Sequence, residues 1–254
     1  RCALHPPGQC ADAVASGTGG NVAVWSNDAT SFDGTISAQG GLRGKGGLVE
    51  TSGHYLDVGN DATVDTLAQD GTAGTWLLDP DNVTIQATGS ETCSTTCAPT
   101  GSNSTLSVAT LEAALAHNNV TVSTGTSGSQ DGDITVASEI SWTSAHTLTL
   151  SASTSSGSIF VDAPIIVGYS GSNPSNAGLL LNYSTSNGSL SFATGGYVNF
   201  ASTGNTLKIN SNSYTLLDSM TGSTGLTSMN GKSGRYALAN SIDASGAGTF
   251  SDSV

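Results

Sequence analysis

The sequence predicts an all-β protein built as a parallel β-helix, with one short α-helix in an insertion. The first observation is compositional: the 254 residues include 33 glycines, only 10% are charged, and Val, Ile, Leu and Thr recur in short bursts between polar turns. The second observation is a unit of 27 residues that repeats near the N-terminus. The unit is marked by glycines at Gly20, Gly47 and Gly74. Two places after each glycine comes an apolar residue, namely Val22, Val49 and Trp76.

The repeated unit aligns further positions. Val24, Thr51 and Leu78 lie four residues after the three glycines, and Ile36 and Val64 hold nearly matching places in the first two units. Such a unit cannot bury its apolar residues alone, but it buries them when it stacks on copies of itself. Each strand then pairs in parallel with its equivalent in the next of about ten coils, and alternate side chains enter a shared core. The residues predicted to be buried are Val22, Val24, Val49, Trp76, Leu78, Val83 and Ile85.

The chain divides into five segments by local composition. Residues 1–20 contain proline and glycine without periodicity, and we expect them to be irregular. Residues 21–86 are predicted to form coils, 87–118 a loop insertion with a short helix, 119–217 further coils, and 218–254 a linker and the start of another unit. The strand-like bursts of the later coils are 119–122, 133–142, 147–153, 158–167, 178–183, 189–194, 197–201 and 206–209.

The insertion has two parts. Ala87–Ser107 is polar and lacks alternation, so we expect a protruding loop. The following string SVATLEAALAHNN predicts a short amphipathic helix, with Thr110 as a candidate cap and Asn118 and Asn119 as its terminators. The apolar residues at helical spacing are Val108, Leu111 and Leu115.

Charge limits the possible partners. The formal net charge is −13 with 6 Lys and Arg residues, too few for the basic face that a nucleic acid requires. There is no run of about 18 apolar residues, so we predict no membrane insertion. The chain begins at Arg1 rather than Met, shows no signal peptide and stops inside what looks like a further unit. We therefore expect a fragment from the middle of a longer protein.

The four cysteines fall in two local pairs, Cys2 with Cys10 and Cys93 with Cys97. Neither pair has the C-x-x-C spacing of zinc or redox sites. We favour two small disulfide loops formed in an oxidising compartment, with free thiols as the alternative.

Acidic residues are the candidates for catalysis or metal binding. Asp57, Asp61 and Asp65 are the densest group, but on a coil they spread around a turn instead of converging. Asp79 and Asp81 flank Pro80, where hydrogen bonds to local backbone are the favoured role. Calcium binding is the alternative at either group, although neither matches a known loop pattern.

The histidines and tryptophans do not suggest a catalytic site. The histidines are far apart in the sequence, and we interpret His54 as a structural residue of a turn. Trp25, Trp76 and Trp142 lie in strand-like bursts, where positions in the core or stacked with other aromatic rings are favoured over sugar-stacking platforms. No catalytic, cofactor-binding or metal-binding residue is therefore predicted, and no cofactor.

Glycosylation sequons are frequent in a chain this rich in Asn, Ser and Thr. Asn103, in the predicted loop, is the most accessible candidate for modification. The five N-x-[ST] asparagines are Asn82, Asn103, Asn119, Asn182 and Asn187.

Several long strings resemble a known family. GGLVETSGHYLDVGNDATVD (46–65) and GTWLLDPDNVTI (74–85) resemble the exoproteins of two-partner secretion systems, the filamentous haemagglutinin and high-molecular-weight adhesin-like proteins. The string at 119–142, followed by TLTLSAS, is also similar to them. RYALANSIDAS (235–245) is similar to the opening of a GLUG-type repeat. The resemblance spans Asn21 to Phe250 and leaves out the first residues, RCALHPPGQC.

The resemblance implies a right-handed winding and export across the outer membrane to the bacterial cell surface or the medium. It implies an outer-membrane transporter as partner, through a region outside this chain, and a host receptor or glycan as a possible ligand. The ligand itself is not identified by the family.

We predict a non-enzymatic shaft fragment of a secreted surface adhesin that mediates attachment to host cells or surfaces. The alternative is the stalk of a contact-dependent growth inhibition toxin, whose activity would lie beyond Val254. A β-helical polysaccharide lyase or hydrolase is less favoured, and a convergent acidic cleft would be its sign. Because a repeat shaft commits its coils to stacking, the Ala87–Ser107 excursion and the 168–177 turn are the predicted contact points for a ligand.

Overall fold

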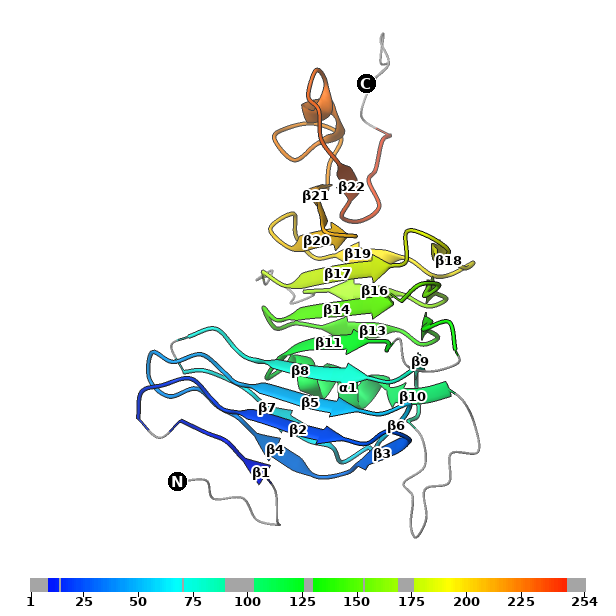
Figure 1. The fold of residues 1–254 in the computed structure, drawn as a ribbon. Coiled ribbons are helices and arrows are strands. Elements are labelled where there is room, and N and C mark those ends of the chain that lie inside the picture. Colours follow the sequence, from blue (N-terminus) through cyan, green and yellow to red (C-terminus); the bar gives the residue numbers. More distant parts are fainter. Residues whose placement is uncertain are drawn as a thin grey trace.

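The computed structural model describes residues 9–13, 15–69, 71–89, 103–125, 130–152, 154–168 and 176–245. In these ranges the chain is all-β, with parallel strands arranged on three faces of an elongated stack (Figure 1). The chain passes from one face to the next and then repeats the circuit one level higher, which is the strand order of a parallel β-helix. The predicted all-β, parallel fold is confirmed, and the right-handed sense of winding stays a prediction.

The first face is a continuous ladder of seven parallel strands in the described chain, fewer than the ten coils expected. Its register follows the 27-residue unit: Val22 pairs with Val49, and Val49 with Trp76. The predicted alignment of the first coils is therefore confirmed. The strands are β2 Asn21–Trp25, β5 Leu48–Ser52, β8 Thr75–Asp79, β11 Asn119–Ser123, β14 Thr147–Ala152, β17 Gly178–Tyr183 and β20 Thr206–Ile209.

The second face contains one strand that the sequence did not reveal. Residues 103–107, the end of the predicted loop, form β10, which pairs in parallel with β9 along its length and touches β6 at Thr105 and Asp57. The third coil therefore supplies two strands to this face. From bottom to top the order is β3 Ala29–Phe32, β6 Tyr55–Val58, β10 Asn103–Ser107, β9 Asn82–Gln86, β12 Ile134–Val136, β15 Ile159–Val161 and β18 Leu190–Phe192.

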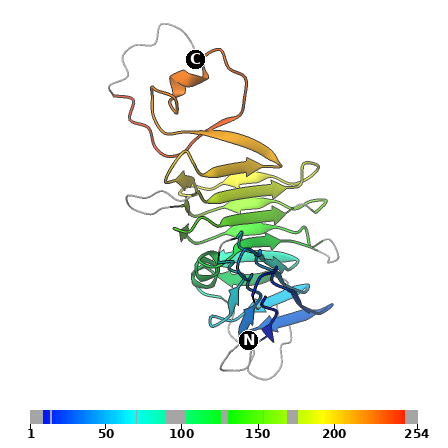
Figure 2. The same ribbon diagram turned by 90° about the vertical axis from the view of Figure 1, so that its left-hand side faces the viewer.

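The third face is divided into two sheets of three strands by the helix α1, Val108–Leu115. Helix α1 packs against β7 below it and β13 above it (Figure 2). It therefore takes the place that a third-face strand would occupy in this coil. The lower sheet is β1 Gln9–Cys10, β4 Thr35–Ser37 and β7 Thr63–Asp65, and the upper sheet is β13 Ile140–Trp142, β16 Ile165–Val167 and β19 Val198–Phe200.

Polar side chains join α1 to both sheets. The fully buried Asn118 accepts hydrogen bonds from the backbone N–H and hydroxyl of Thr66 and donates to the carbonyls of Val64 and Ala114. It therefore completes the open upper edge of β7 as a strand would. On the other side, Glu112 Oε1 accepts from the backbone N–H of Ser141 in β13 at 2.6 Å.

The predicted helix is confirmed, but its cap is not Thr110. Ser107 is the N-cap, and its hydroxyl oxygen accepts from the backbone N–H of Thr110 at 3.0 Å. The helix ends at Leu115, before the asparagines expected to terminate it. Leu111 and Leu115 are buried as predicted, and Val108 is partly buried.

The predicted irregularity of residues 1–20 is wrong at Gln9–Cys10, which form β1, whereas the described residues from Ala11 to Gly20 contain no helix or strand. Strand β1 pairs in parallel with β4, and the backbone N–H of Ala11 donates to Ser37 at 2.7 Å. The carboxylate of Asp12 accepts from Ser37 and from the backbone N–H of Gln39. This segment therefore joins the bottom of the third face.

The parallel coils end at β20, earlier than the predicted residue 217. Strand β21, Asn212–Leu217, runs antiparallel to β20 because the two-residue turn Asn210–Ser211 has φ values of 46° and 65°, the backbone of a tight hairpin. Beyond it come a 3₁₀ helix, Leu226–Met229, and β22, Tyr236–Leu238, which pairs in parallel with β21.

The core lies between the three faces. Val49, Trp76, Leu78, Val83 and Ile85 are buried as predicted. Val22 and Val24 are only partly buried, because β2 is the lowest strand of the first face.

Candidate functional site

A column of three residues ends the lowest strands of the first face. Trp25, Ser52 and Asp79 are the last residues of β2, β5 and β8, and the register places each beside the next. A parallel ladder brings equivalent positions together, so side chains 27 residues apart become neighbours. Just beyond this column the chain turns toward the second face.

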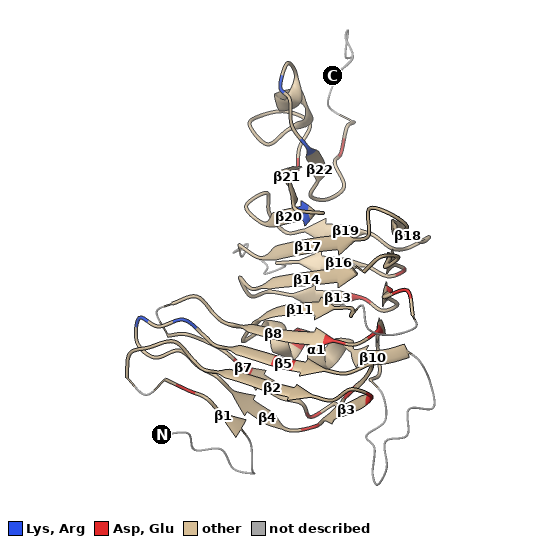
Figure 3. Ribbon diagram, in the orientation of Figure 1, with Lys and Arg blue, Asp and Glu red and all other residues tan. Residues whose placement is uncertain are grey.

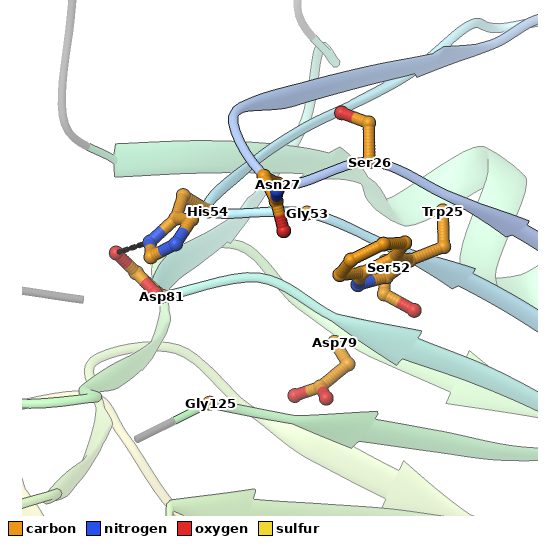
Figure 4. A pocket seen from close by; sticks show the side chains of 9 residues that line it. All are labelled: Trp25, Ser26, Asn27, Ser52, Gly53, His54, Asp79, Asp81 and Gly125. Atoms are coloured by element: carbon orange, nitrogen blue, oxygen red, sulfur yellow. Dashed lines mark hydrogen bonds and ion pairs between the residues drawn. The ribbon is translucent and has the colours of Figure 1, made fainter. Parts of the chain in front are cut away.

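A cleft opens at this corner, with a volume of about 160 Å³ (Figure 4). Successive coils contribute to it, so residues far apart in the sequence lie around one opening. Figure 4 shows the indole of Trp25 lying near Ser52, with Asp79 below it and His54 and Asp81 on the opposite side. The lining residues are Trp25, Ser26, Asn27, Ser52, Gly53, His54, Asp79, Asp81 and Gly125.

Trp25 departs from the predicted core position, because 62% of it is exposed. The prediction is confirmed for Trp76 and Trp142, which are 0% and 4% exposed. Each of these two donates its indole N–H inside the stack, to the hydroxyl of Thr51 and the carbonyl of His146 respectively. Trp25 differs because it lies on the outward side of the lowest strand.

His54 and Asp81 form a polar pair across two coils. His54 Nδ1 lies 3.0 Å from Asp81 Oδ2, and Asp81 is buried. The favoured role of Asp81, a hydrogen bond to local backbone, is therefore replaced by a side-chain partner 27 residues away. The pair holds the corner after β5 against the corner after β8.

Asp79 has a different environment from that of Asp81. Its Oδ1 is buried and has no hydrogen-bond partner among the described residues, so the predicted turn role is not seen there. Burial raises the pKa of Asp79 above its ordinary value, and the negative charges of Glu50 and Asp81 raise it further. In the described part of the chain, no Lys or Arg forms an ion pair with this carboxylate of the cleft wall.

The other acidic group does not converge, as the sequence indicated. Asp57 is buried and accepts from the hydroxyl of Ser31 at 3.2 Å. Asp65 accepts from the side-chain amide of Gln39, whereas Asp61 is exposed at a corner. In the described part of the chain, no three His, Cys, Asp or Glu side chains are grouped as a metal site.

The sequon asparagines differ in how fully the fold uses their side chains. Asn119 donates to Ala73 and Gly74 and accepts from Thr147, and Asn82 accepts from two backbone N–H groups of the coil above. Asn103 is exposed, but it begins β10 and does not lie in a loop. Asn187 is also exposed and donates to the carbonyl of Ser155, while Asn182 is partly buried in β17. Asn103 and Asn187 are therefore the accessible pair.

Other predicted features fall mostly beyond the described ranges. Cys10 is disulfide-bonded, whereas Cys2, Cys93 and Cys97 lie outside the described residues. Most of the two predicted contact loops, residues 90–102 and 169–175, also lies outside them.

The amino-acid sequence contains a signal for this cleft. The 27-residue repeat that aligned the glycines also aligns Trp25, Ser52 and Asp79. These positions point out of the core, because they differ by one or three residues from the inward positions.

Comparison of the chain with protein-family models, with curated proteins and with solved structures gave no match. Among the described helices, none has the length and apolar character needed to cross a membrane.

Proposed function

We propose that this chain is a segment of the shaft of a secreted bacterial adhesin of the filamentous haemagglutinin type, which mediates attachment to host cells or surfaces without enzymatic activity. The observation that carries the proposal is the continuous first face, in which every strand from β2 to β20 pairs in parallel and in register with the next. Such stacking builds an extended body and leaves the corners free to present side chains.

The outer surface of the stack suits this role. Its outward strand positions are rich in short hydroxyl side chains, as in Thr84 and Thr135, which are neighbours on the second face. Acidic residues lie mainly at corners, and the few basic residues lie at one corner of the lower coils and near the upper end of the stack (Figure 3). A net charge of −13 favours a soluble, self-repelling shaft.

A second candidate, polysaccharide hydrolysis, rests on the acidic groups beside the cleft. Asp79, with its raised pKa, near Asp81 is the kind of pairing that glycosidases use. Two contacts favour the non-enzymatic function instead. Asp79 Oδ1 is buried, and Asp81 is bonded to His54, so neither carboxylate is free to act as acid and base at a glycosidic bond.

The test is attachment of the purified chain to cells. Beads coated with folded protein are expected to bind cultured epithelial cells more than beads coated with the same protein after unfolding. A parallel assay measures reducing sugar released from a panel of polysaccharides and is expected to give none. Equal attachment by folded and unfolded protein contradicts the adhesin function, and sustained sugar release overturns the non-enzymatic part.

A further inference from the structure

We propose that the cleft at Trp25 binds one ring of a neutral hexopyranoside, stacked on the exposed indole. This inference rests on the proposed function, because it names the class of ligand that such a shaft would hold. The cleft volume of about 160 Å³ suits one sugar ring better than a long chain.

The fold itself does not require an aromatic side chain at position 25. The next two residues in the same column are Ser52 and Asp79, so this outward position is compatible with small or polar side chains. A tryptophan that is 62% exposed at the rim of a cleft leaves one ring face open to solvent. The C–H face of a pyranose covers such a surface and removes apolar area from water.

Polar groups around the indole suit the hydroxyls of a sugar. The exposed amide of Asn27 offers both donors and an acceptor at the rim. Asp79 lies on the cleft wall, and the His54–Asp81 pair closes the opposite side. A few directed polar groups beside an aromatic surface are the usual composition of a small-molecule site.

Charge selects neutral sugars over acidic ones. Among the described residues no Lys or Arg lines the cleft, whereas Asp79 and Asp81 do, and the charge of Glu50 acts on Asp79. A sialic acid, a uronic acid or a sulfated sugar would place a second negative charge against these carboxylates. Binding of neutral hexosides should therefore exceed binding of their acidic counterparts.

Tryptophan fluorescence offers a direct measurement, because Trp25 is exposed while Trp76 and Trp142 are buried. Quenching by acrylamide should report mainly on Trp25. We expect a methyl hexopyranoside from a panel of galactosides, glucosides and mannosides to protect it in a saturable manner. Methyl glucuronide and sialyllactose should give no protection.

Two substitutions locate the effect. Trp25→Ala should lower affinity about tenfold or more, and Trp25→Phe, which keeps a smaller ring, should lower it less. The affinities of both variants are measured by NMR titration, which does not need the indole. Tyr197→Ala is the matched control, since Tyr197 is 48% exposed near the top of the stack and should bind like the wild type.

The outcomes separate this inference from the proposed function. If no neutral hexoside protects Trp25, or if folded Trp25→Ala binds as the wild type does, the sugar site is wrong. Cell attachment that is retained while sugar binding is absent leaves the adhesin function standing. Sugar binding without cell attachment leaves the site standing and rejects the adhesin function.

Discussion

The lower coils, residues 21–86, and the upper coils, residues 119–209, stack in the same way but use different side chains to do so. In the upper coils the inward positions of the first face are aliphatic in every strand from β11 to β17, as in Val122, Leu150 and Leu181. In the lower coils the same column contains Thr51, whose hydroxyl accepts from the indole of Trp76 at 3.0 Å. The inward side chains of the first face are therefore aliphatic in these upper strands, whereas the same face of the lower coils also contains a hydrogen bond between two side chains.

The residues that immediately precede the first-face strands also differ between the lower and the upper coils. In the lower coils this column of residues contains Gly47 and Gly74, where backbones approach so closely that a Cβ on Gly74 would lie 1.9 Å from the carbonyl oxygen of Gly47. In the upper coils the column contains the buried asparagines Asn118 and Asn205, which bond to third-face carbonyls of the coil below. The comparison teaches that close backbone approach and asparagine bridges are alternative ways to tie a coil to its neighbour.

The largest expected effect is at the junction between the two regions. Asn118→Ala should lower the free energy of unfolding by about 3–5 kcal/mol, because it leaves the buried N–H of Thr66 and the carbonyl of Val64 without the partners they have in the wild type. Urea denaturation measures the change. Asn205→Ala, which removes bonds to Ala177 and Val167, should cost less. A larger loss at Asn205 than at Asn118 would contradict the special role of the junction.

A smaller loss is expected from the glycine column. Gly74→Ala should destabilise the protein by about 3 kcal/mol, because the new methyl group meets backbone that cannot move away without separating two coils. Gly34→Ala is the matched control from the same region, since a Cβ there meets nothing within 4 Å. Thermal unfolding of both variants tests the prediction, and equal melting temperatures would show that the lower backbones are not tightly packed.

The hydrogen bond in the lower core gives a third comparison. Thr51→Val should cost about 1–2 kcal/mol, because it preserves shape but leaves the buried indole N–H of Trp76 without an acceptor. Thr51→Ser keeps the oxygen and is the control for the lost methyl group. If the valine variant is as stable as the wild type in urea, the lower core does not depend on this bond.

The smallest effect concerns pH. Because the folded-state pKa of Asp79 is raised, its contribution favours the folded state at low pH and is lost as pH rises through that pKa. Asp79→Asn should therefore be more stable than the wild type at neutral pH, with the difference shrinking in acid. Asp131→Asn, at an exposed position, controls for the removal of one negative charge. Melting temperatures across a pH series measure both, and a variant that loses stability at neutral pH would contradict the raised pKa.

The regular parts of the fold could be predicted because alternation reports directly on burial. The strands at 119–122, 147–153 and 178–183 were placed correctly, and the 27-residue repeat predicted the register of Val49 with Trp76. Strand β10 was missed because its letters, NSTLS, are those of a polar loop. It becomes a strand through pairing with β9, and no local pattern reports such a partner.

The candidate site was predicted less well than the fold. Trp25 was assigned to the core because it ends a strand-like burst. Side chains alternate along a strand, however, and Trp25 follows the inward-facing Val24, so it points outward from the lowest strand. Asp81 was assigned to its own turn because proline and asparagine surround it, whereas its partner is His54 in the coil below. The local sequence predicts turns well. Contacts between coils are harder to predict, because they depend on the number of residues in each coil.

Helix α1 gives the stack a direction of easy bending. On the first face, backbone ladders run without interruption from β2 to β20, so any curvature that stretches this face must lengthen many backbone hydrogen bonds. On the third face, β7 and β13 are not paired, and a few side chains, chiefly Asn118 and Glu112, span the gap through the helix. Under a lateral force the stack should therefore open first at α1, so that this coil acts as a hinge between two stiffer segments.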